Sequence, residues 1–362
     1  MRYRRQVILP DFGSKAQKKL TDASVLVIGA GGLGVPVLQY ITAAGVGHIG
    51  IIDHDVVDLS NLHRQVIYTE VEIGQNKAAL AHKKMQALNS DIKIEAIHAK
   101  IEPHNAIDII SKYDIIIDCT DNFPTRYLVN DACFFCKKTL VYGAIFRWEG
   151  QLSVFNYNNS ANYRDLFPNP PHPGEVPNCE EGGVIGVLPG IIGSMMANEC
   201  IKIISNVGSV LSEKLLMYDA KSSSSLIIKY KKRSDNPISG TRPSIIKLID
   251  YEEFCGLKKY SFHDDTISSA ELKTMLNGGE KIQLIDVREK EEFVFQNIGG
   301  LNIPISKIKT NTNEIEYDIP VVLICQTGKR SMSVLNFLKK EHDFDNLQSL
   351  DGGLKAYLVV SR

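Results

Sequence analysis

Neither charge sign dominates this chain of 362 residues, and no long apolar run interrupts it. The 41 lysines and arginines face 42 aspartates and glutamates, and the resulting formal charge of −1 disfavours a partner with a strongly charged surface. The longest apolar run, residues 183–197, contains a proline and four glycines and is shorter than a bilayer span. We therefore expect neither a nucleic-acid partner nor a membrane-spanning helix.

Cysteine is scarce and odd in number, which excludes a scaffold built on disulfides. The chain has seven cysteines, and its first apolar stretch, residues 7–10, is too short for the core of a signal peptide. Free thiols in a reducing cytoplasm account for both features, so we expect a cytoplasmic protein. The composition, 44% hydrophobic and 23% charged, is that of a globular protein, and the length favours two or three domains at roughly 150 residues each.

Strand and helix patterns alternate through the N-terminal part of the chain. Short β-branched apolar segments, typical of buried parallel strands, occur at 24–28, 48–53, 93–97, 113–119 and 139–143. Helical patterns lie between them, so the sequence predicts an α/β fold with a Rossmann-like doubly wound sheet. Residues 160–181 are rich in Pro, Asn and Gly and are predicted to form a long functional loop.

The same rhythm restarts near the C-terminus. Ser268 and Glu271 have the spacing of a capping box at a helix start, and strands are predicted at 283–287 and 321–325. This stretch is long enough for a smaller α/β domain of its own. We place the first domain at 1–240, a linker at 241–261 and the second domain at 262–362.

A glycine-rich turn follows the first predicted strand. The segment Gly29-Ala30-Gly31-Gly32-Leu33-Gly34 has the spacing G-x-G-x-x-G, in which glycines let the backbone approach a phosphate at a helix N-terminus. Asp53 ends the next strand, where a carboxylate can bind ribose hydroxyls. By itself this motif favours a dinucleotide-binding oxidoreductase.

Charged residues beyond the turn favour a nucleoside triphosphate instead. Arg64, Lys77 and Arg5 are cations of the kind that neutralise a departing pyrophosphate. The segment Asp118-Cys119-Thr120-Asp121-Asn122 places carboxylates at the end of a strand, a natural position for Mg²⁺. The alternative is a solvated surface for Arg64 and Lys77 and a helix cap for Asp121.

Five segments, taken in their order along the chain, closely resemble the MoeB/ThiF family, the bacterial relatives of ubiquitin-activating enzymes. They are residues 2–6, 29–34, 58–65, 74–77 and 118–122, and the resemblance covers roughly residues 1–240. It implies a homodimer that uses ATP and Mg²⁺ to adenylate the C-terminal glycine of a ubiquitin-like sulfur carrier protein of MoaD or ThiS type.

The resemblance also implies roles for individual residues. Gly29, Gly31, Gly32 and Gly34 form the nucleotide turn, and Asp53 binds the ribose. The remaining implied contacts are with the phosphates for Asn61, Arg64 and Lys77, with Mg²⁺ and the α-phosphate for Asp121, and with the partner subunit's ATP for Arg5.

Cys325 begins the loop Cys325-Gln326-Thr327-Gly328-Lys329-Arg330-Ser331, between a predicted strand and a predicted helix. Such a loop points backbone N–H groups inward, and together with Lys329 and Arg330 it favours a thiolate. With residues 284–288 and 351–353, the loop resembles a rhodanese domain over roughly 262–362. This implies a persulfide on Cys325, supplied by a cysteine desulfurase or another sulfur donor.

The other cysteines divide into one candidate and a set of core thiols. Cys179, in the long loop, is a plausible second nucleophile near an acyl-adenylate, against the alternative of an unreactive exposed thiol. Cys133 and Cys136 form a C-x-x-C without a second pair, which disfavours a zinc site. Cys119, Cys200 and Cys255 read as core thiols.

The chain departs from the family in its zinc site. Many members have two C-x-x-C pairs, whereas this chain has Asn162-Tyr163-Arg164-Asp165 and Asn236-Pro237-Ile238-Ser239 at those positions. We therefore expect no structural zinc.

The sequence as a whole predicts an adenylyltransferase and sulfurtransferase that makes a thiocarboxylate in molybdopterin or thiamine biosynthesis. Alternatives are an NAD-dependent oxidoreductase with a fused rhodanese domain, a non-catalytic binder of a ubiquitin-like protein, or an enzyme that adenylates a peptide or a tRNA base.

Overall fold

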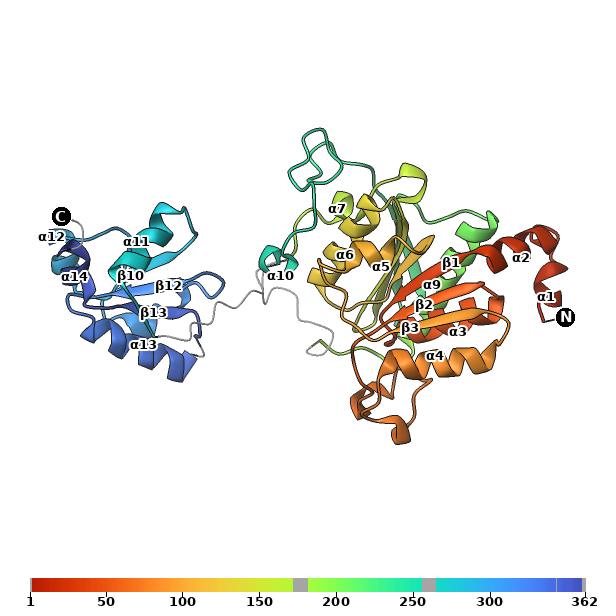
Figure 1. Ribbon diagram of the computed structural model, residues 1–362, viewed down its shortest axis with the longest axis horizontal. Helices are drawn as coiled ribbons and strands as arrows, with labels where there is room; N and C mark the ends of the chain where they lie inside the picture. The colour runs from red at the N-terminus through yellow and green to blue at the C-terminus, as the bar shows by residue number, and fades with distance from the viewer. Residues whose placement is uncertain (1, 172–181, 256–264, 343, 360–362) are drawn as a thin grey trace. The chain divides into compact units, whose positions relative to one another are not determined.

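The computed structural model describes residues 2–171, 182–255, 265–342 and 344–359 (Figure 1). The chain divides into two compact units, Met1–Cys255 and Gly256–Arg362, each with its own sheet. Within the described ranges, no helix combines the length and the apolar character needed to cross a bilayer.

The first unit contains an eight-stranded sheet of order β3-β2-β1-β4-β5-β6-β7-β8. Strands β1 to β5 run parallel, and β5 to β8 pair antiparallel. The doubly wound sheet expected from the sequence is thus confirmed. The strands are β1 Ser24–Ile28, β2 His48–Ile52, β3 Lys93–Ile97, β4 Ile115–Asp118, β5 Thr139–Phe146, β6 Glu149–Phe155, β7 Lys214–Asp219 and β8 Ser224–Lys229.

Helices cover both faces of this sheet because each central strand is apolar on both sides. Val25 and Val27 of β1 belong to the core beneath α3, α4 and α9, whereas Leu26 and Ile28 belong to the core beneath α5 and α6. The helices are α1 Arg4–Val7, α2 Gly13–Asp22, α3 Gly34–Ala44, α4 Lys77–Leu88, α5 Ala106–Ile110, α6 Phe123–Phe135, α7 Tyr163–Leu166, α9 Leu188–Ser205 and α10 Tyr251–Phe254. Short 3₁₀ turns occur at Leu59–Asn61, Glu70–Glu72 and Tyr157–Asn159.

The segment 160–171 is not the irregular loop that we expected. It contains the short helix α7, because Asn162 and Asp165 form a capping box: the Asn162 side chain accepts from the Arg164 N–H, and the Asp165 carboxylate accepts from the Asn162 N–H at 2.8 Å. The remainder of the predicted loop, residues 172–181 with Cys179, lies outside the described residues.

A buried ion pair ties α7 to the core of the first unit. The Arg164 guanidinium donates two hydrogen bonds of 2.8 Å to the Asp131 carboxylate, and both side chains are fully buried. The Tyr251 hydroxyl donates to the same carboxylate at 2.8 Å, which fastens α10 to α6. Residues 251–255 fall in the range predicted as a linker, yet Tyr251 and Cys255 are core residues of the first unit.

The second unit is a parallel sheet of order β11-β10-β12-β13-β9, with helices on both faces. The capping box predicted at Ser268 and Glu271 is present at the start of α11. The elements are β9 Thr266–Ile267, α11 Ser269–Asn277, β10 Gln283–Asp286, α12 Lys290–Phe295, β11 Leu301–Asn302, β12 Val321–Ile324, α13 Lys329–His342, β13 Leu347–Leu350 and α14 Gly353–Val359, with 3₁₀ turns at Ile308–Thr310 and Thr312–Glu314.

The Asp131→Ala substitution tests the buried pair. It leaves the Arg164 charge buried without its partner, which costs about 3–5 kcal/mol of the free energy of unfolding of the first unit. Fluorescence of Trp148, the single tryptophan of the chain, follows urea unfolding of this unit alone. Asp235→Ala is the control, since its pair with Arg233 is exposed, and we expect an unchanged midpoint. Equal midpoints for Asp131→Ala and the native chain would contradict a stabilising role for this pair.

Candidate functional site

A cavity of about 480 Å³ lies at the carboxyl ends of β1, β2 and β4 in the first unit. The order of the strands along the sheet runs from β1 to β3 in one direction and from β4 to β8 in the other. Doubly wound sheets bind their ligands at such a switch point, here between β1 and β4. Most residues that the sequence singled out for a nucleotide line this cavity: Gly29, Gly31, Gly32, Asp53, Asn61, Arg64, Lys77 and Asp121.

The glycine turn is shaped by close backbone contacts. Gly29 has a φ of +94°, which other residues rarely adopt. Gly34 starts α3 and is not among the lining residues; a Cβ there would lie 1.9 Å from the Gly29 carbonyl oxygen. Gly34 therefore permits the tight turn itself, while Gly31 and Gly32 border the cavity.

Asp53 holds the turn in place. Its carboxylate oxygens accept hydrogen bonds from the Ala30 N–H at 2.7 Å and the Asp55 N–H at 2.8 Å. Burial raises the pKa of Asp53, and these two hydrogen bonds and the Lys77 charge oppose that rise. A carboxylate oxygen has more than one acceptor position, so Asp53 can still receive a hydroxyl donor from the cavity.

The cations of the cavity are partly neutralised by the protein. The Lys77 ammonium is buried and lies 3.2 Å from an Asp55 oxygen. Arg64 donates to the Ser60 carbonyl at 2.8 Å. The Asn61 side chain closes a capping box with Asp58. These contacts exclude the free, solvated surface that was the alternative for Lys77.

The two carboxylates after β4 have different environments. Asp118 is buried, and one of its oxygens accepts from the Thr120 N–H and hydroxyl at 2.9 and 2.7 Å. Burial raises the pKa of Asp118 despite these bonds. Asp121 is exposed at the cavity wall, and the cap of α6 is Asn122, which accepts from the Thr125 N–H at 3.0 Å. Asp121 is thus available to a ligand, and the helix-cap alternative is wrong.

The ligand atoms of Asp53, His54 and Asp55 lie close enough to one another to be considered as a metal site. Asp53 is committed to backbone N–H groups and Asp55 to Lys77. This trio therefore reads as a polar network of the cavity wall and not as an open cation site.

Arg5, which was predicted to reach ATP, lies apart from this cavity. Arg5 belongs to α1 and borders a separate depression with Tyr40 and Ile201, so it does not line the cavity of its own chain. Cys179 is among the residues that are not described.

Two residues of the site were missed from the sequence. Gln65 is 3% exposed and lines the cavity beside Gly31. Tyr68 is buried behind it, and its hydroxyl lies 2.8 Å from the Ala30 carbonyl oxygen and 3.2 Å from that of Lys77. Tyr68 therefore links the glycine turn to the start of α4. The position of Gln65 directly after Arg64, in the segment 58–65, was the available signal; Tyr68 lies outside that segment.

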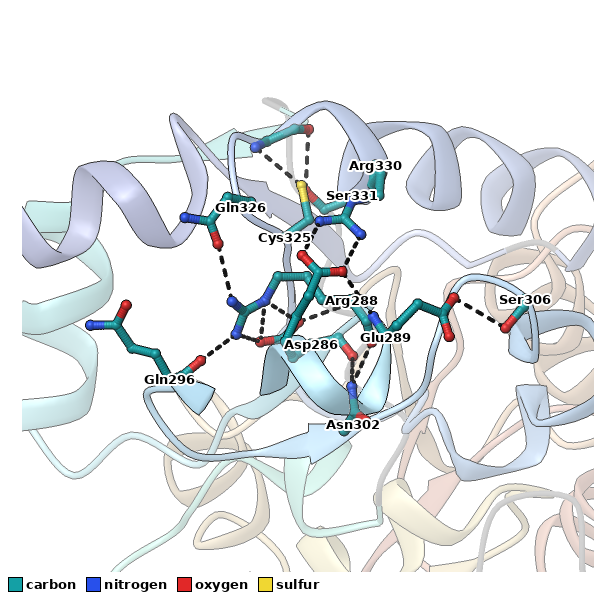
Figure 2. A network of polar contacts seen from close by, with 12 residues as sticks. Asp286, Arg288, Glu289, Gln296, Asn302, Ser306, Cys325, Gln326, Arg330 and Ser331 are labelled. Carbon is teal, nitrogen blue, oxygen red and sulfur yellow. Dashed lines mark hydrogen bonds and ion pairs between the residues drawn. The ribbon is translucent and has the colours of Figure 1, made fainter. Parts of the chain in front are cut away.

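Cys325 lies in the second unit at the carboxyl end of β12, in the loop that leads to α13 (Figure 2). Its sulfur accepts from the Gly328 N–H at 3.1 Å and from the Ser331 hydroxyl at 3.4 Å. Burial raises the pKa of the thiol, but the hydrogen bonds from Ser331, Thr327 and Gly328 outweigh it, so the pKa is lowered overall. This is a cradle for a thiolate or a persulfide.

The glycines near the C-terminus explain the backbone of this cradle. A Cβ on Gly353 would lie 2.3 Å from the Cys325 carbonyl oxygen, so only glycine allows α14 to start there. The Leu354 N–H then donates to the same oxygen at 2.8 Å. The segment 351–353 thus supports the loop from behind.

Arg330, which was expected to favour the thiolate, is also paired with a carboxylate. Both of its terminal nitrogens donate to Glu292 at 2.7 Å, and the pKa of Arg330 is raised by this contact with Glu292 and also by the charge of Cys325. Arg288, nearly buried, is likewise paired with Asp286 at 2.6 Å. The donors closest to the sulfur are the backbone and Ser331.

Four residues at the positions of the missing zinc ligands form a polar cluster, which we call the asparagine cluster: Asn162, Asp165, Asn236 and Ser239. Asn236 donates to Asn162 at 3.1 Å and to Asp165 at 2.7 Å, and Asn162 donates to Ser239 at 2.9 Å. Asn162 and Asn236 are 1% exposed. Hydrogen bonds therefore join the segment around 236–239 to α7.

Both halves of the chain match known families. The model of the ThiF family matches residues 3–238, and that of the rhodanese-like domain matches residues 268–359. In fold, the chain is similar to E. coli MccB, with a TM-score of 0.58 at 20% identity over 67% of this chain and 74% of that one.

Two relatives match this chain over almost its whole length, and a third matches 71% of it. The probable adenylyltransferase/sulfurtransferase MoeZ of Mycobacterium tuberculosis is 44% identical over 98% of this chain and 92% of that protein. The adenylyltransferase and sulfurtransferase MOCS3 of Arabidopsis thaliana is 39% identical over 98% and 82%. The sulfur carrier protein adenylyltransferase of Thermus thermophilus is 48% identical over 71% and 97%. The chain thus belongs to the ThiF family and, with its C-terminal rhodanese-like domain, is an adenylyltransferase and sulfurtransferase.

Proposed function

We propose that this enzyme adenylates the C-terminal glycine of a ubiquitin-like sulfur carrier protein and then transfers sulfur from a Cys325 persulfide to form a thiocarboxylate. One observation carries the proposal. The same chain has a cavity lined by Arg64 and Lys77, which suits phosphates, and a loop that cradles the sulfur of Cys325. Molybdopterin or thiamine biosynthesis, as suggested by the family, is the pathway that would use such a product.

In the first step the carrier's carboxylate attacks the α-phosphorus of ATP, and pyrophosphate leaves. Neither group needs a protein nucleophile, so positioning and charge compensation supply the catalysis. Asp53 and the glycine turn would bind the nucleoside side, and Arg64, Lys77 and Asn61 the phosphates. The partial neutralisation of Lys77 by Asp55 is compatible with this role, since a triphosphate carries more charge than one carboxylate.

Mg²⁺ would be held by Asp121, the exposed carboxylate at the cavity wall. The fit rests on its exposure and on the oxygen donors that Mg²⁺ prefers. When bound, the ion would offset phosphate charge. Asp118 would not bind it directly, because this side chain is buried behind the cavity and bonded to Thr120.

In the second step the outer sulfur of the Cys325 persulfide attacks the acyl carbon, and AMP leaves. The product is an acyl disulfide on Cys325. Attack by a second thiol on the Cys325 sulfur releases the thiocarboxylate and leaves a disulfide between that thiol and Cys325, which a cellular dithiol reduces before the next cycle. Cys179, predicted as a nucleophile near the acyl-adenylate, is the candidate we propose for that thiol. A cysteine desulfurase is the donor we propose for the persulfide.

Arg5 supports the proposal of a homodimer. It does not line the cavity of its own chain, so it can reach ATP only in a second subunit. The free thiols among the described residues fit work in the reducing cytoplasm.

The asparagine cluster supports the absence of a structural zinc. Amide, carboxylate and hydroxyl groups replace all four thiolates that a tetrahedral zinc site would need, and they bond to one another instead. We propose that these hydrogen bonds serve in place of the metal.

Exchange between ATP and pyrophosphate tests the division of labour. With a MoaD-like or ThiS-like carrier, we expect Cys325→Ala and Cys179→Ala to keep exchange, while Cys325→Ala forms no thiocarboxylate. Lys77→Ala should slow exchange by about a hundredfold through lost charge compensation. Lys83→Ala, an exposed lysine of the same helix, is the control. A chain that binds NAD in preference to ATP, or shows no carrier-dependent exchange, would refute the proposal.

Ser331 tests the origin of the thiolate. Its hydroxyl stabilises the charged sulfur, so Ser331→Ala should raise the pKa of Cys325 and slow iodoacetamide alkylation near neutral pH several-fold. The rate rises with pH in both proteins, but the midpoint of the variant lies higher. Ser333→Ala, whose hydroxyl faces away and donates to Lys329, should leave the midpoint unchanged. A common midpoint for all three proteins would rule out this source of the shift.

Metal content and stability test the asparagine cluster. Elemental analysis should find no zinc, and EDTA should leave the urea midpoint of Trp148 fluorescence unchanged. Asn236→Ala removes donors to two buried acceptors and should cost about 1–3 kcal/mol of unfolding free energy. One zinc per purified chain would overturn this interpretation.

A further inference from the structure

Two arginines lie beside the Cys325 loop, and a carboxylate holds each of them. Arg288 Nη2 donates to Asp286 and to the Gln296 carbonyl, both at 2.6 Å, and Nη1 donates to the Gln326 side chain at 3.1 Å. Figure 2 shows these side chains gathered below Cys325. The Arg288 guanidinium is therefore part of the scaffold that positions the loop, and its charge is balanced by Asp286.

Arg330 is the more accessible of the two, with 36% of its side chain exposed. Its two terminal nitrogens form a bidentate pair with Glu292 of α12, at 2.7 Å each. This contact lowers the pKa of Glu292 to about 2, so the carboxylate stays charged at neutral pH. Two of the five N–H donors of Arg330 are thus engaged by Glu292, whose carboxylate balances the Arg330 charge before an anionic sulfur donor binds.

The cradle that remains is suited to a single negative charge. The donors to the sulfur are neutral groups: the Ser331 hydroxyl and backbone N–H groups of the loop, among them that of Gly328 at 3.1 Å. Lys329, the residue before Arg330, is exposed. Among the described residues, no ion pair to Lys329 is found. A persulfide on another protein brings at most one charge, whereas thiosulfate brings two.

We propose that Glu292, by holding Arg330, determines which sulfur donors Cys325 accepts and discriminates against small divalent anions such as thiosulfate in favour of protein persulfides. This inference rests on the proposed function of Cys325 as the persulfide carrier. Glu292 acts through Arg330 and is a positioning residue; it does not touch the reacting sulfur.

The two donors use the same displacement. The Cys325 thiolate attacks the outer sulfur of thiosulfate, the S–S bond breaks, and sulfite leaves with the electron pair. With a protein persulfide, the same attack releases the donor's thiolate. Thiosulfate carries two negative charges before the attack and sulfite carries two after it, so a free Arg330 would bind this donor more tightly than a protein persulfide throughout the reaction.

Glu292→Gln tests the proposal without removing the start of α12, because glutamine can replace glutamate in the capping box with Glu289. The freed Arg330 should lower the KM for thiosulfate at least about fivefold in thiocyanate formation with cyanide, with little change in kcat. Glu291→Gln removes the same charge from the neighbouring exposed position and should leave the KM unchanged. Adding Arg330→Gln to Glu292→Gln should restore the high KM.

A second measurement does not depend on turnover. Cys325 is modified by an anionic methanethiosulfonate, the sulfonatoethyl reagent, and by the neutral methyl reagent, with Cys325→Ala as the blank. Glu292→Gln should raise the ratio of the anionic to the neutral rate severalfold, and Glu291→Gln should not. A merely structural role would slow both reagents together.

An unchanged ratio together with an unchanged thiosulfate KM in Glu292→Gln would overturn the inference. So would equal effects of Glu291→Gln and Glu292→Gln, since these would show a general charge effect. The proposed function fails differently: the native chain would then form no Cys325 persulfide with any donor, as judged by mass spectrometry.

Discussion

The parallel pairing of β1 with β2 and β4 is the constraint on which the first site depends. Ile28 pairs with Ile52 on one side and Asp118 on the other, so three strands end at one level. Gly29, Asp53 and Cys119 follow at once. The Gly29 N–H donates to the Ile52 carbonyl and the Cys119 N–H to the Ile28 carbonyl, each at 2.9 Å. The glycine turn, the Asp53 carboxylate and one wall of the cavity are thereby brought together by the pairing of the strands.

In both units, a cation near the anion-binding position is paired with a carboxylate of the protein when no ligand is bound. Lys77 is balanced by Asp55 and Arg330 by Glu292. In the first unit, positive charge remains for a triphosphate, because Arg64 is hydrogen-bonded to the Ser60 carbonyl and the His63 ring and not to a carboxylate. In the second unit the sulfur is stabilised by backbone and hydroxyl donors, which suit one charge and provide a simple basis for selectivity.

The segments that depart from the family pattern show how buried polar groups replace one another. In the asparagine cluster, Asn236 satisfies Asn162 and Asp165, whereas Arg164 between them turns inward to Asp131. Most of these polar groups are bonded, because an unpaired one in the core is costly; Arg164 Nη1 is an exception, with no hydrogen-bond partner among the described residues. The connection of α7 to the rest of the unit is thus made by hydrogen bonds and one ion pair.

The sequence by itself determined the features that local spacing encodes: the alternation of strands and helices in a doubly wound sheet, the glycine turn, the capping box at Ser268 and the Cys325 loop. It also identified Asp53, Arg64, Lys77 and Asp121, which the fold brings to one cavity. Only the tertiary structure decided how distant charges pair, such as Arg330 with Glu292 and Tyr251 with Asp131. The physical reason is that backbone conformation follows neighbouring residues, whereas an ion pair depends on where the path of the whole chain places its members.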